Sequence, residues 1–455
     1  MMMKRKSLVI LGGCLLAAGA FLLQAGASAQ AENELTHKAR QFMAALEKGD
    51  FNLAVRDFDE TMLKVSGPDK LEPFWKEQFP KQVGSFKKQT AARREKLGAY
   101  EVVLVTCEFE KATLDARVVF DKAGKIAGFS FVPSLPPAKY ELPAYADAAK
   151  FEEREVTVGS GEWALPGTLT MPRGDGPFPG LVLVHGSGAN DRDESLGPNK
   201  PFKDLAWGLA SRGIAVLRYD KRSKVYGAKI VADPKLEASL TVKEETIDDA
   251  LTAAALLQKT AKIDKGRVFI LGHSLGGFLM PRIAVAAKPM GIAGFISMAG
   301  LTRPLDDTIL RQIMYLSGGD TSEGTKKRLE SIKEEVAKIK AFTEADRGTT
   351  VKVLGAMPSY WLDVRGYNPP ELAKTLSKPM LILQGSRDYQ VTTEDFDNWK
   401  AALGSRQDVE FHLYPKLNHF FFEGQGLPTP NEYIQIHGSV APYVIEDIAA
   451  WILKR

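Results

Sequence analysis

A serine flanked by glycines lies near the middle of the chain. Residues 272–276 read Gly-His-Ser-Leu-Gly, which matches the G-x-S-x-G pattern of serine nucleophiles. An apolar run, 268–271, precedes this pattern, and an apolar segment, 277–287, follows it. This context predicts a strand that turns sharply into a helix, with Ser274 exposed at the helix N-terminus as the nucleophile. The alternative is a Gly-rich turn with no chemical role.

A serine hydroxyl needs a base that accepts its proton. The chain contains six histidines, and His419 follows the strand-like run 409–413 in a loop. We predict His419 as the general base. His437 is its competitor and ranks well behind it. His185 and His273 lie in Gly-containing turns, where a packing role is usual.

A carboxylate usually holds the base in the correct tautomer. Asp388 follows the strand-like run 380–383, and the carboxyl ends of parallel strands are where such sheets assemble sites. We therefore predict Asp388 as the acid. Asp395 and Asp397 are nearby, but their positions favour the helix that follows. The resulting order along the chain is serine, aspartate, histidine.

An oxyanion that develops on the substrate needs fixed hydrogen-bond donors. One predicted donor is the backbone N–H of Leu275, the residue after the nucleophile. The second is expected from the loop 185–188, which follows the strand-like run 181–184. We predict Ser187 as that donor, with Gly188 as the alternate. The alternative is a tight strand-to-helix turn without a catalytic role.

Charged and aromatic residues lie near these predicted loops. Residues 191–193 read Asp-Arg-Asp, and 219–222 read Tyr-Asp-Lys-Arg. They could bind substrate, but a mutual salt-bridge network is the favoured interpretation. Tyr360 and Trp361 could line an acyl pocket, although aromatic residues in an insertion more often pack its own core.

The elements that must position these residues form an α/β pattern over 152–455. Short apolar runs alternate with helical periods, which predicts a mostly parallel sheet flanked by helices. Residues 301–376 interrupt this alternation between two predicted strands and are interpreted as a cap insertion. The expected strands are 181–184, 214–217, 268–271, 292–298, 380–383 and 409–413, and the expected helices include 246–257 and 443–453.

A smaller α+β unit is predicted over 31–134. An amphipathic helix opens it, with a second short helix at 51–58, and strand-like runs follow at 99–109, 112–121 and 125–132. We find no convergent acid, base or metal set in this unit. Its predicted role is structural or substrate-gating. A Pro-rich linker, 135–151, is expected to join the two units.

The N-terminal residues 1–30 have the pattern of a signal peptide, with a short basic region, an apolar run and a small-residue cleavage site. The apolar run 8–23 is shorter than the roughly 20 residues that span a bilayer as a helix. We therefore expect an exported protein, periplasmic or extracellular, with no integral membrane span in its mature chain. Lipid anchoring at Cys14 ranks lower.

Composition excludes several function classes. The chain has 60 Lys plus Arg against 56 Asp plus Glu, so its charge does not predict a nucleic-acid partner. Only two cysteines occur. Removal of the signal would leave Cys107 alone, so no disulfide can form within the mature chain. No Cys/His cluster has zinc spacing, and no metal is expected.

Residues 152–455 resemble bacterial secreted carboxylesterases of the α/β-hydrolase superfamily, on the segments 185–188, 272–277, 385–388 and 418–419. The first unit resembles the small nuclear-transport-factor-like domain that some of these esterases carry. The resemblance implies an α/β-hydrolase fold that hydrolyses small-molecule carboxylic esters with no cofactor.

The same catalytic elements occur in other hydrolases of this fold. A serine peptidase or amidase, or a thioesterase, is the principal alternative. Dienelactone hydrolases usually carry cysteine as nucleophile, whereas this chain has serine. A catalytically inactive binding protein is the remaining alternative, and degenerate hydrolases usually lack a triad member, which this chain does not.

Overall fold

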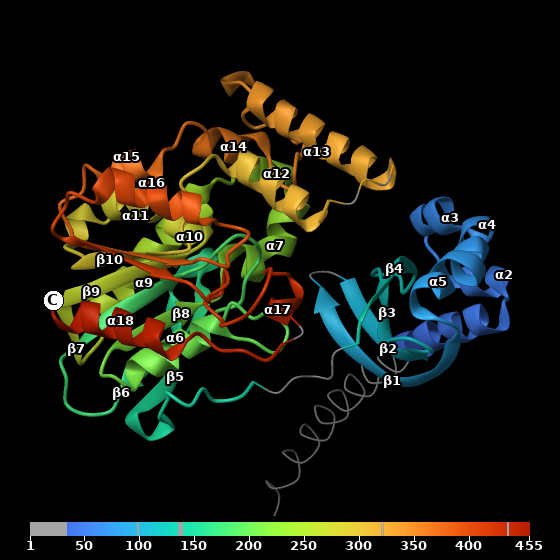
Figure 1. Cartoon of the computed structure of the whole chain (residues 1–455), viewed down its shortest axis with the longest axis horizontal. Coiled ribbons are helices and arrows are strands. Elements are labelled where there is room, and N and C mark those ends of the chain that lie inside the picture. The colour runs from blue at the N-terminus through green and yellow to red at the C-terminus, as the bar shows by residue number, and fades with distance from the viewer. Residues whose placement is uncertain (1–33, 98–99, 135–139, 320, 322, 435) are drawn as a thin grey trace, which may run out of the picture. The chain divides into compact units, whose positions relative to one another are not determined.

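The computed structural model describes residues 34–97, 100–134, 140–319, 321, 323–434 and 436–455. The chain divides between Pro136 and Pro137 into two compact units (Figure 1). The predicted signal peptide, with Cys14, lies outside the described residues. Among the residues described, no helix has the length and apolar character needed to cross a membrane.

The first unit is an α+β unit with an antiparallel sheet in the order β1-β2-β3-β4. Residues 34–48 are helical, and short helices lead from there to the sheet. Its core contains an aromatic cluster in which Trp75, Phe79 and Phe109 are in mutual ring contact. The elements are α2 (Phe51–Ala54), α3 (Glu60–Ser66), α4 (Pro68–Pro73), α5 (Phe79–Val83), β1 (Phe86–Leu97), β2 (Tyr100–Phe109), β3 (Thr113–Phe120) and β4 (Ile126–Pro133).

Strand β1 and helices α3, α4 and α5 are absent from the sequence-based prediction. β1 reads FKKQTAARREKL, and its charged side chains hide the strand pattern. Ion pairs with β2 and β3 explain those charges: Arg94 contacts Glu101 at 2.7 Å, and Arg93 contacts the buried Asp115 at 2.6 Å. Partners on other strands stabilise this strand, so local periodicity could not reveal it.

The second unit contains an eight-stranded sheet in the order β12-β11-β10-β9-β7-β8-β6-β5. The strands from β12 to β8 are mutually parallel, whereas β6 and β5 are antiparallel to their neighbours. Their bounds are β5 (Phe151–Val158), β6 (Leu165–Pro172), β7 (Phe178–Val184), β8 (Ala215–Tyr219), β9 (Ile263–His273), β10 (Gly294–Met298), β11 (Met380–Gly385) and β12 (Val409–Tyr414).

Helices cover both faces of this sheet (Figure 1). One apolar core lies under α9 (Asp248–Gln258), α10 (Leu275–Phe278), α11 (Met280–Ala286) and α16 (Thr393–Leu403). The other lies under α6 (Pro201–Ala210) and α18 (Pro442–Leu453). The predicted strands and helices of this unit are present, and the parallel order brings the ends of β7, β8, β9, β11 and β12 to one edge.

Two segments of this unit differ from expectation. Strands β5 and β6 have no counterpart in the predicted elements. β5 reads FEEREVTV and is mostly exposed, so it lacks the apolar pattern of a buried strand. The predicted linker, 135–151, is not free of contacts in its described part. Tyr140 donates a hydrogen bond to Asp204 of α6, and its ring contacts Trp207. Aromatic side chains thus bind this segment to the second unit.

The cap insertion lies between β10 and β11, at the point the sequence predicts. Helices α12 (Leu305–Leu316), α13 (Glu323–Ala341) and α14 (Pro358–Val364) form it, and α12 packs against α13 (Figure 1). α15 (Pro369–Ala373) follows and instead packs against α11 and α16. The last part of the insertion therefore belongs to the helical layer over the sheet.

Candidate active site

Ser274 occupies a strained turn between β9 and α10. Its φ of +53° and ψ of −112° lie outside the regions that L-residues prefer. Its backbone N–H donates to the carbonyl of Met298 at 2.9 Å. A Cβ on Gly272 would lie 2.3 Å from the backbone of Gly276, and a Cβ on Gly276 would lie 2.5 Å from the carbonyl of Val184. The turn can form only with glycine at both positions.

His419 and Asp388 form a buried pair. Their atoms Nδ1 and Oδ2 are 2.6 Å apart. The other carboxylate oxygen of Asp388 accepts the backbone N–H groups of Gln390 and Val391 at 2.8 and 2.9 Å. These donors fix the carboxylate, and the carboxylate in turn selects the imidazole tautomer with the proton on Nδ1.

The loop that carries His419 is held from several sides. The Asn418 side chain accepts the backbone N–H groups of Phe420 and Phe422, each at 3.1 Å. Asn418 also donates to Glu432, which pairs with Arg387 at 2.6 Å. These contacts give Arg387 and Asn418 a structural role that the sequence pattern did not assign.

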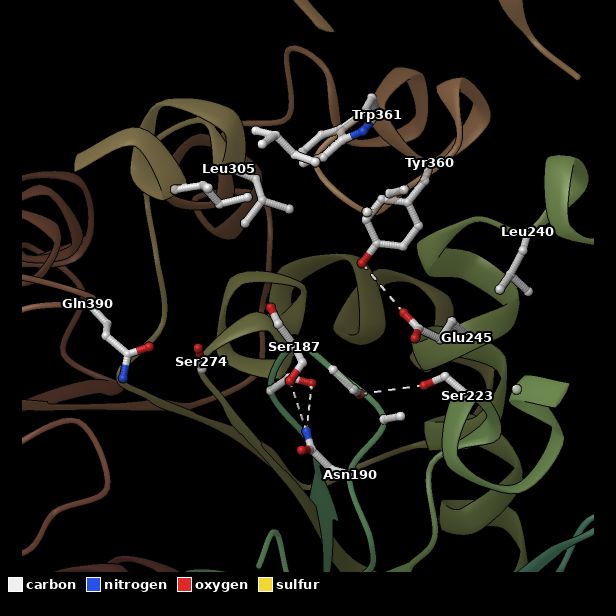
Figure 2. A pocket seen from close by; sticks show the side chains of 18 of the residues that line it. Ser187, Asn190, Ser223, Leu240, Glu245, Ser274, Leu305, Tyr360, Trp361 and Gln390 are labelled. Atoms are coloured by element: carbon white, nitrogen blue, oxygen red, sulfur yellow. Dashed lines mark hydrogen bonds between the residues drawn. The ribbon is translucent and has the colours of Figure 1, made fainter. Parts of the chain in front are cut away.

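Ser274 and His419 line one cavity of about 680 Å³. The loop that follows β7 and the cap contribute to the same cavity. Figure 2 shows Ser274 and Ser187 on one side and Leu305, Tyr360 and Trp361 on the other. Both aromatic residues of α14 therefore face the cavity, and Trp361 also donates its indole N–H to the cap carbonyl of Val353 at 2.9 Å.

Of the two predicted oxyanion donors, Ser187 lines this cavity, and Leu275 directly follows Ser274, which also lines it. Ser187 follows β7, and Leu275 is the first residue of α10. Within the described residues, neither backbone N–H has an acceptor in the protein. The adjacent Gly186 lies close to the nucleophile, because a Cβ on it would be 3.1 Å from Cβ of Ser274. Free N–H groups beside a serine suit the binding of a developing oxyanion.

A second buried histidine lies behind the serine. His273 contacts Glu194 at 2.8 Å, and its Nε2 lies 3.0 Å from the carbonyl oxygen of His419. Burial opposes the charge on His273, but Glu194 outweighs it and raises the pKa of His273. Glu194 also accepts the Gly186 N–H at 2.8 Å. The sequence pattern did not reveal Glu194, which adopts a positive φ of 52°.

His185 is also buried, and within the described residues its Nε2 has no hydrogen-bond partner. Burial lowers its pKa to about 4. At neutral pH His185 is therefore uncharged, and it packs against Phe202 and Tyr219.

The alternatives weighed for base and acid lie elsewhere. His437 is exposed and lies in a separate depression. Asp395 is buried at the start of α16, where it binds Arg303 and Thr302. The Asp-Arg-Asp charges of 191–193 pair mainly with other protein groups, as in the contact of Arg192 with Asp220 at 3.0 Å. These groups form a network rather than a second reactive cluster.

Two families match separate parts of the chain. The family described as "Alpha/beta hydrolase family" matches residues 181–429. A family described as a protein of unknown function, DUF3887, matches residues 39–129. The first of these covers the segments that carry Ser187, Ser274, Asp388 and His419.

The chain also resembles known proteins and solved structures. The chain is 41% identical to esterase EstD of Thermotoga maritima over 358 residues, which cover 78% of this chain and 80% of that protein. It is 21% identical to dipeptidyl peptidase family member 6 of Caenorhabditis elegans over 74% of this chain, but that match spans only 38% of the relative. An esterase structure from Pyrococcus furiosus covers 70% of this chain and 98% of its own, with 13% identity and a TM-score of 0.42.

Proposed function

We propose that this chain, which belongs to the alpha/beta hydrolase family and hydrolyses carboxylic esters, does so through an acyl-enzyme formed on Ser274. The family and the esterase relative confirm the predicted fold class and the predicted activity. The catalytic residues and the covalent intermediate are the parts that we propose.

The observation that carries the proposal is the placement of three groups. The His419–Asp388 contact of 2.6 Å and the strained Ser274 turn occur at the same edge of the sheet, and serine and histidine line one cavity. With Nδ1 protonated and bound to Asp388, Nε2 of His419 is the nitrogen that can accept the serine proton.

In the proposed reaction, Ser274 Oγ attacks the ester carbonyl while His419 accepts its proton. The N–H groups of Ser187 and Leu275 bind the carbonyl oxygen as it becomes negative. His419 then gives the proton to the leaving alcohol, which departs when the tetrahedral intermediate collapses to the acyl-enzyme. Water, activated by the same histidine, attacks the acyl group and releases the acid.

Steady-state hydrolysis of p-nitrophenyl esters from acetate to laurate tests this proposal, with wild type and Ser274→Ala compared side by side. We expect turnover in the wild type alone, with labelling of the wild-type serine by a fluorophosphonate probe. Full activity or full labelling in the Ser274→Ala protein would contradict the mechanism. An aminoacyl p-nitroanilide, measured in parallel, separates ester from amide preference.

We propose in addition that the protein is exported and that residues 1–30 are removed on the way. The basic, apolar and small-residue segments of that region support this proposal. Fractionation of cells, followed by N-terminal sequencing of the protein found outside the cytoplasm, tests it. A protein that retains Met1 and stays in the cytoplasm would contradict it.

A further inference from the structure

Lys221 is a buried lysine whose charge faces the oxyanion loop. It lies just after β8, which pairs with β7, and only 2% of its surface is exposed. Its Nζ donates to the carbonyl oxygen of Gly186 at 2.9 Å and lies 3.5 Å from Oε1 of Glu245. Burial of an ammonium group is costly unless it is paired and hydrogen-bonded. Both partners of Lys221 line the active-site cavity.

The carbonyl that Lys221 binds belongs to the same peptide unit as the N–H of Ser187. This peptide bond is trans, because the single cis bond among the described residues joins Gly176 and Pro177. In a planar trans peptide the C=O and N–H bonds point in opposite directions. A group that holds the Gly186 carbonyl therefore also fixes the direction of the Ser187 N–H.

Charged groups of opposite sign hold Gly186 at both ends. Glu194 accepts its N–H at 2.8 Å, and Lys221 donates to its carbonyl. Asn190 donates to the same carbonyl at 3.3 Å and to the Ser187 carbonyl at 3.1 Å (Figure 2). A cation on a peptide oxygen also draws electron density from the peptide nitrogen, which makes its N–H a stronger donor.

We propose that Lys221 is a positioning residue for the oxyanion site: it orients and polarises the Gly186–Ser187 peptide so that the Ser187 N–H stabilises the tetrahedral intermediate. This inference rests on the proposed function, because it needs Ser187 as an oxyanion donor. It differs from the role that the sequence favoured for residues 219–222, a salt-bridge network, since the nearest partner of Lys221 is a neutral carbonyl in the active site.

The cap is connected to this arrangement. Glu245, the acidic partner of Lys221, also accepts a hydrogen bond of 3.5 Å from the hydroxyl of Tyr360 on α14. A continuous series of polar contacts thus leads from the cap through Glu245 and Lys221 to the Ser187 peptide. Cap packing can therefore influence the oxyanion site without direct contact with Ser274.

The test compares Lys221→Met with wild type and with Lys224→Met, a matched control at an exposed lysine three residues away. Turnover of p-nitrophenyl butyrate is expressed per serine labelled by a fluorophosphonate probe. We expect kcat of Lys221→Met to fall about 10- to 100-fold, somewhat less than loss of a whole oxyanion donor, with KM within about twofold. Lys224→Met should match wild type.

A transition-state analogue supplies the readout that a merely structural role would not change. An aryl trifluoromethyl ketone forms a hemiketal oxyanion on the serine, so its affinity should fall in Lys221→Met by a factor similar to that of kcat. If kcat per labelled serine and inhibitor affinity stay within about twofold of wild type, the proposal is wrong, even when the melting temperature falls.

Two further variants keep the result interpretable. If Lys221→Met does not fold, Asn190→Ala removes the second donor to the same carbonyl, and we expect a several-fold fall in kcat with KM unchanged. An unchanged kcat in Asn190→Ala would overturn the proposal.

Ser274→Ala separates the two proposals. Full activity in that protein contradicts the serine mechanism, whereas an inactive Ser274→Ala with an unaffected Lys221→Met contradicts only the role of Lys221.

Discussion

The two units of this chain bury polar groups in different ways. In the first, the buried carboxylate of Asp115 binds Arg93 and two hydroxyl groups within the unit's own sheet. In the second, the buried Asp388 and Lys221 follow strand ends, and each contacts a residue that lines the active-site cavity: His419 and Gly186. A buried polar group therefore suggests a catalytic role only where its partner also faces a cavity.

The largest expected effect is at His419, with His437 of the same unit as its control. His419→Ala should lower kcat on p-nitrophenyl esters by at least about 10⁴-fold, because the serine loses its base. His437→Ala should leave turnover unchanged, since His437 is exposed and lies outside the active-site cavity. Parallel steady-state kinetics measure both. Comparable losses in the two variants would contradict the assignment of the base.

Substitution of one buried carboxylate in each unit sharpens the comparison. Asp388→Asn should lower kcat by about 10³- to 10⁴-fold through the wrong histidine tautomer, with little loss of folding. Asp115→Asn should leave kcat unchanged but destabilise the first unit by about 1–3 kcal/mol, because it weakens the pair with Arg93. Kinetics and thermal unfolding separate the two results. Loss of activity in folded Asp115→Asn would show that the first unit contributes to catalysis.

Asp204 provides a pH-dependent test within the second unit. Burial raises its pKa from 3.8 to about 7, although Tyr140 and the Val440 N–H bind it. The folded state therefore holds a proton that the unfolded state has released, so the contribution to stability is present at low pH and is lost as pH rises from about 4 to about 7. The free energy of unfolding falls by about 1.4 kcal/mol per pH unit in that window.

Denaturant unfolding of wild type and Asp204→Asn at pH 4.5 and 7.5 measures this contribution. The asparagine variant cannot ionise, so its stability relative to wild type should improve by about 3 kcal/mol between the two pH values. Asp175→Asn, at an exposed aspartate, is the control and should show no such change. A pH-independent difference for Asp204→Asn would contradict the raised pKa.

The smallest effect is expected at Cys107 in the first unit. This thiol is fully buried in β2, and burial raises its pKa to about 12. A thiol reagent such as DTNB should therefore not react with the native protein lacking residues 1–30, and should titrate one thiol after denaturation. Rapid reaction in the native state would show that the sheet of the first unit opens.

Local sequence patterns predicted the parallel strands β7 to β12 of the second unit and placed Ser274, Asp388 and His419 at one edge of its sheet. Those predictions succeeded because apolar strands buried on both faces, and a glycine-bounded turn, have signatures within a few residues. Strands β1 and β5 were not predicted because their charged side chains have ionic partners on other strands, as in the pairs Arg94–Glu101 and Arg218–Glu153. Lys221 was assigned to a salt-bridge network because no local signal reveals that its ammonium group faces Gly186, 35 residues earlier.

The proposed base, His419, lies on the loop after the edge strand β12, whereas the proposed nucleophile, Ser274, directly follows the interior strand β9. The serine is synthesised well before its histidine. A nascent chain, or one in which β12 has detached from the sheet, therefore has Ser274 without the proposed base, His419. On the proposed mechanism, a chain in which β12 has not yet joined the sheet cannot hydrolyse esters through Ser274.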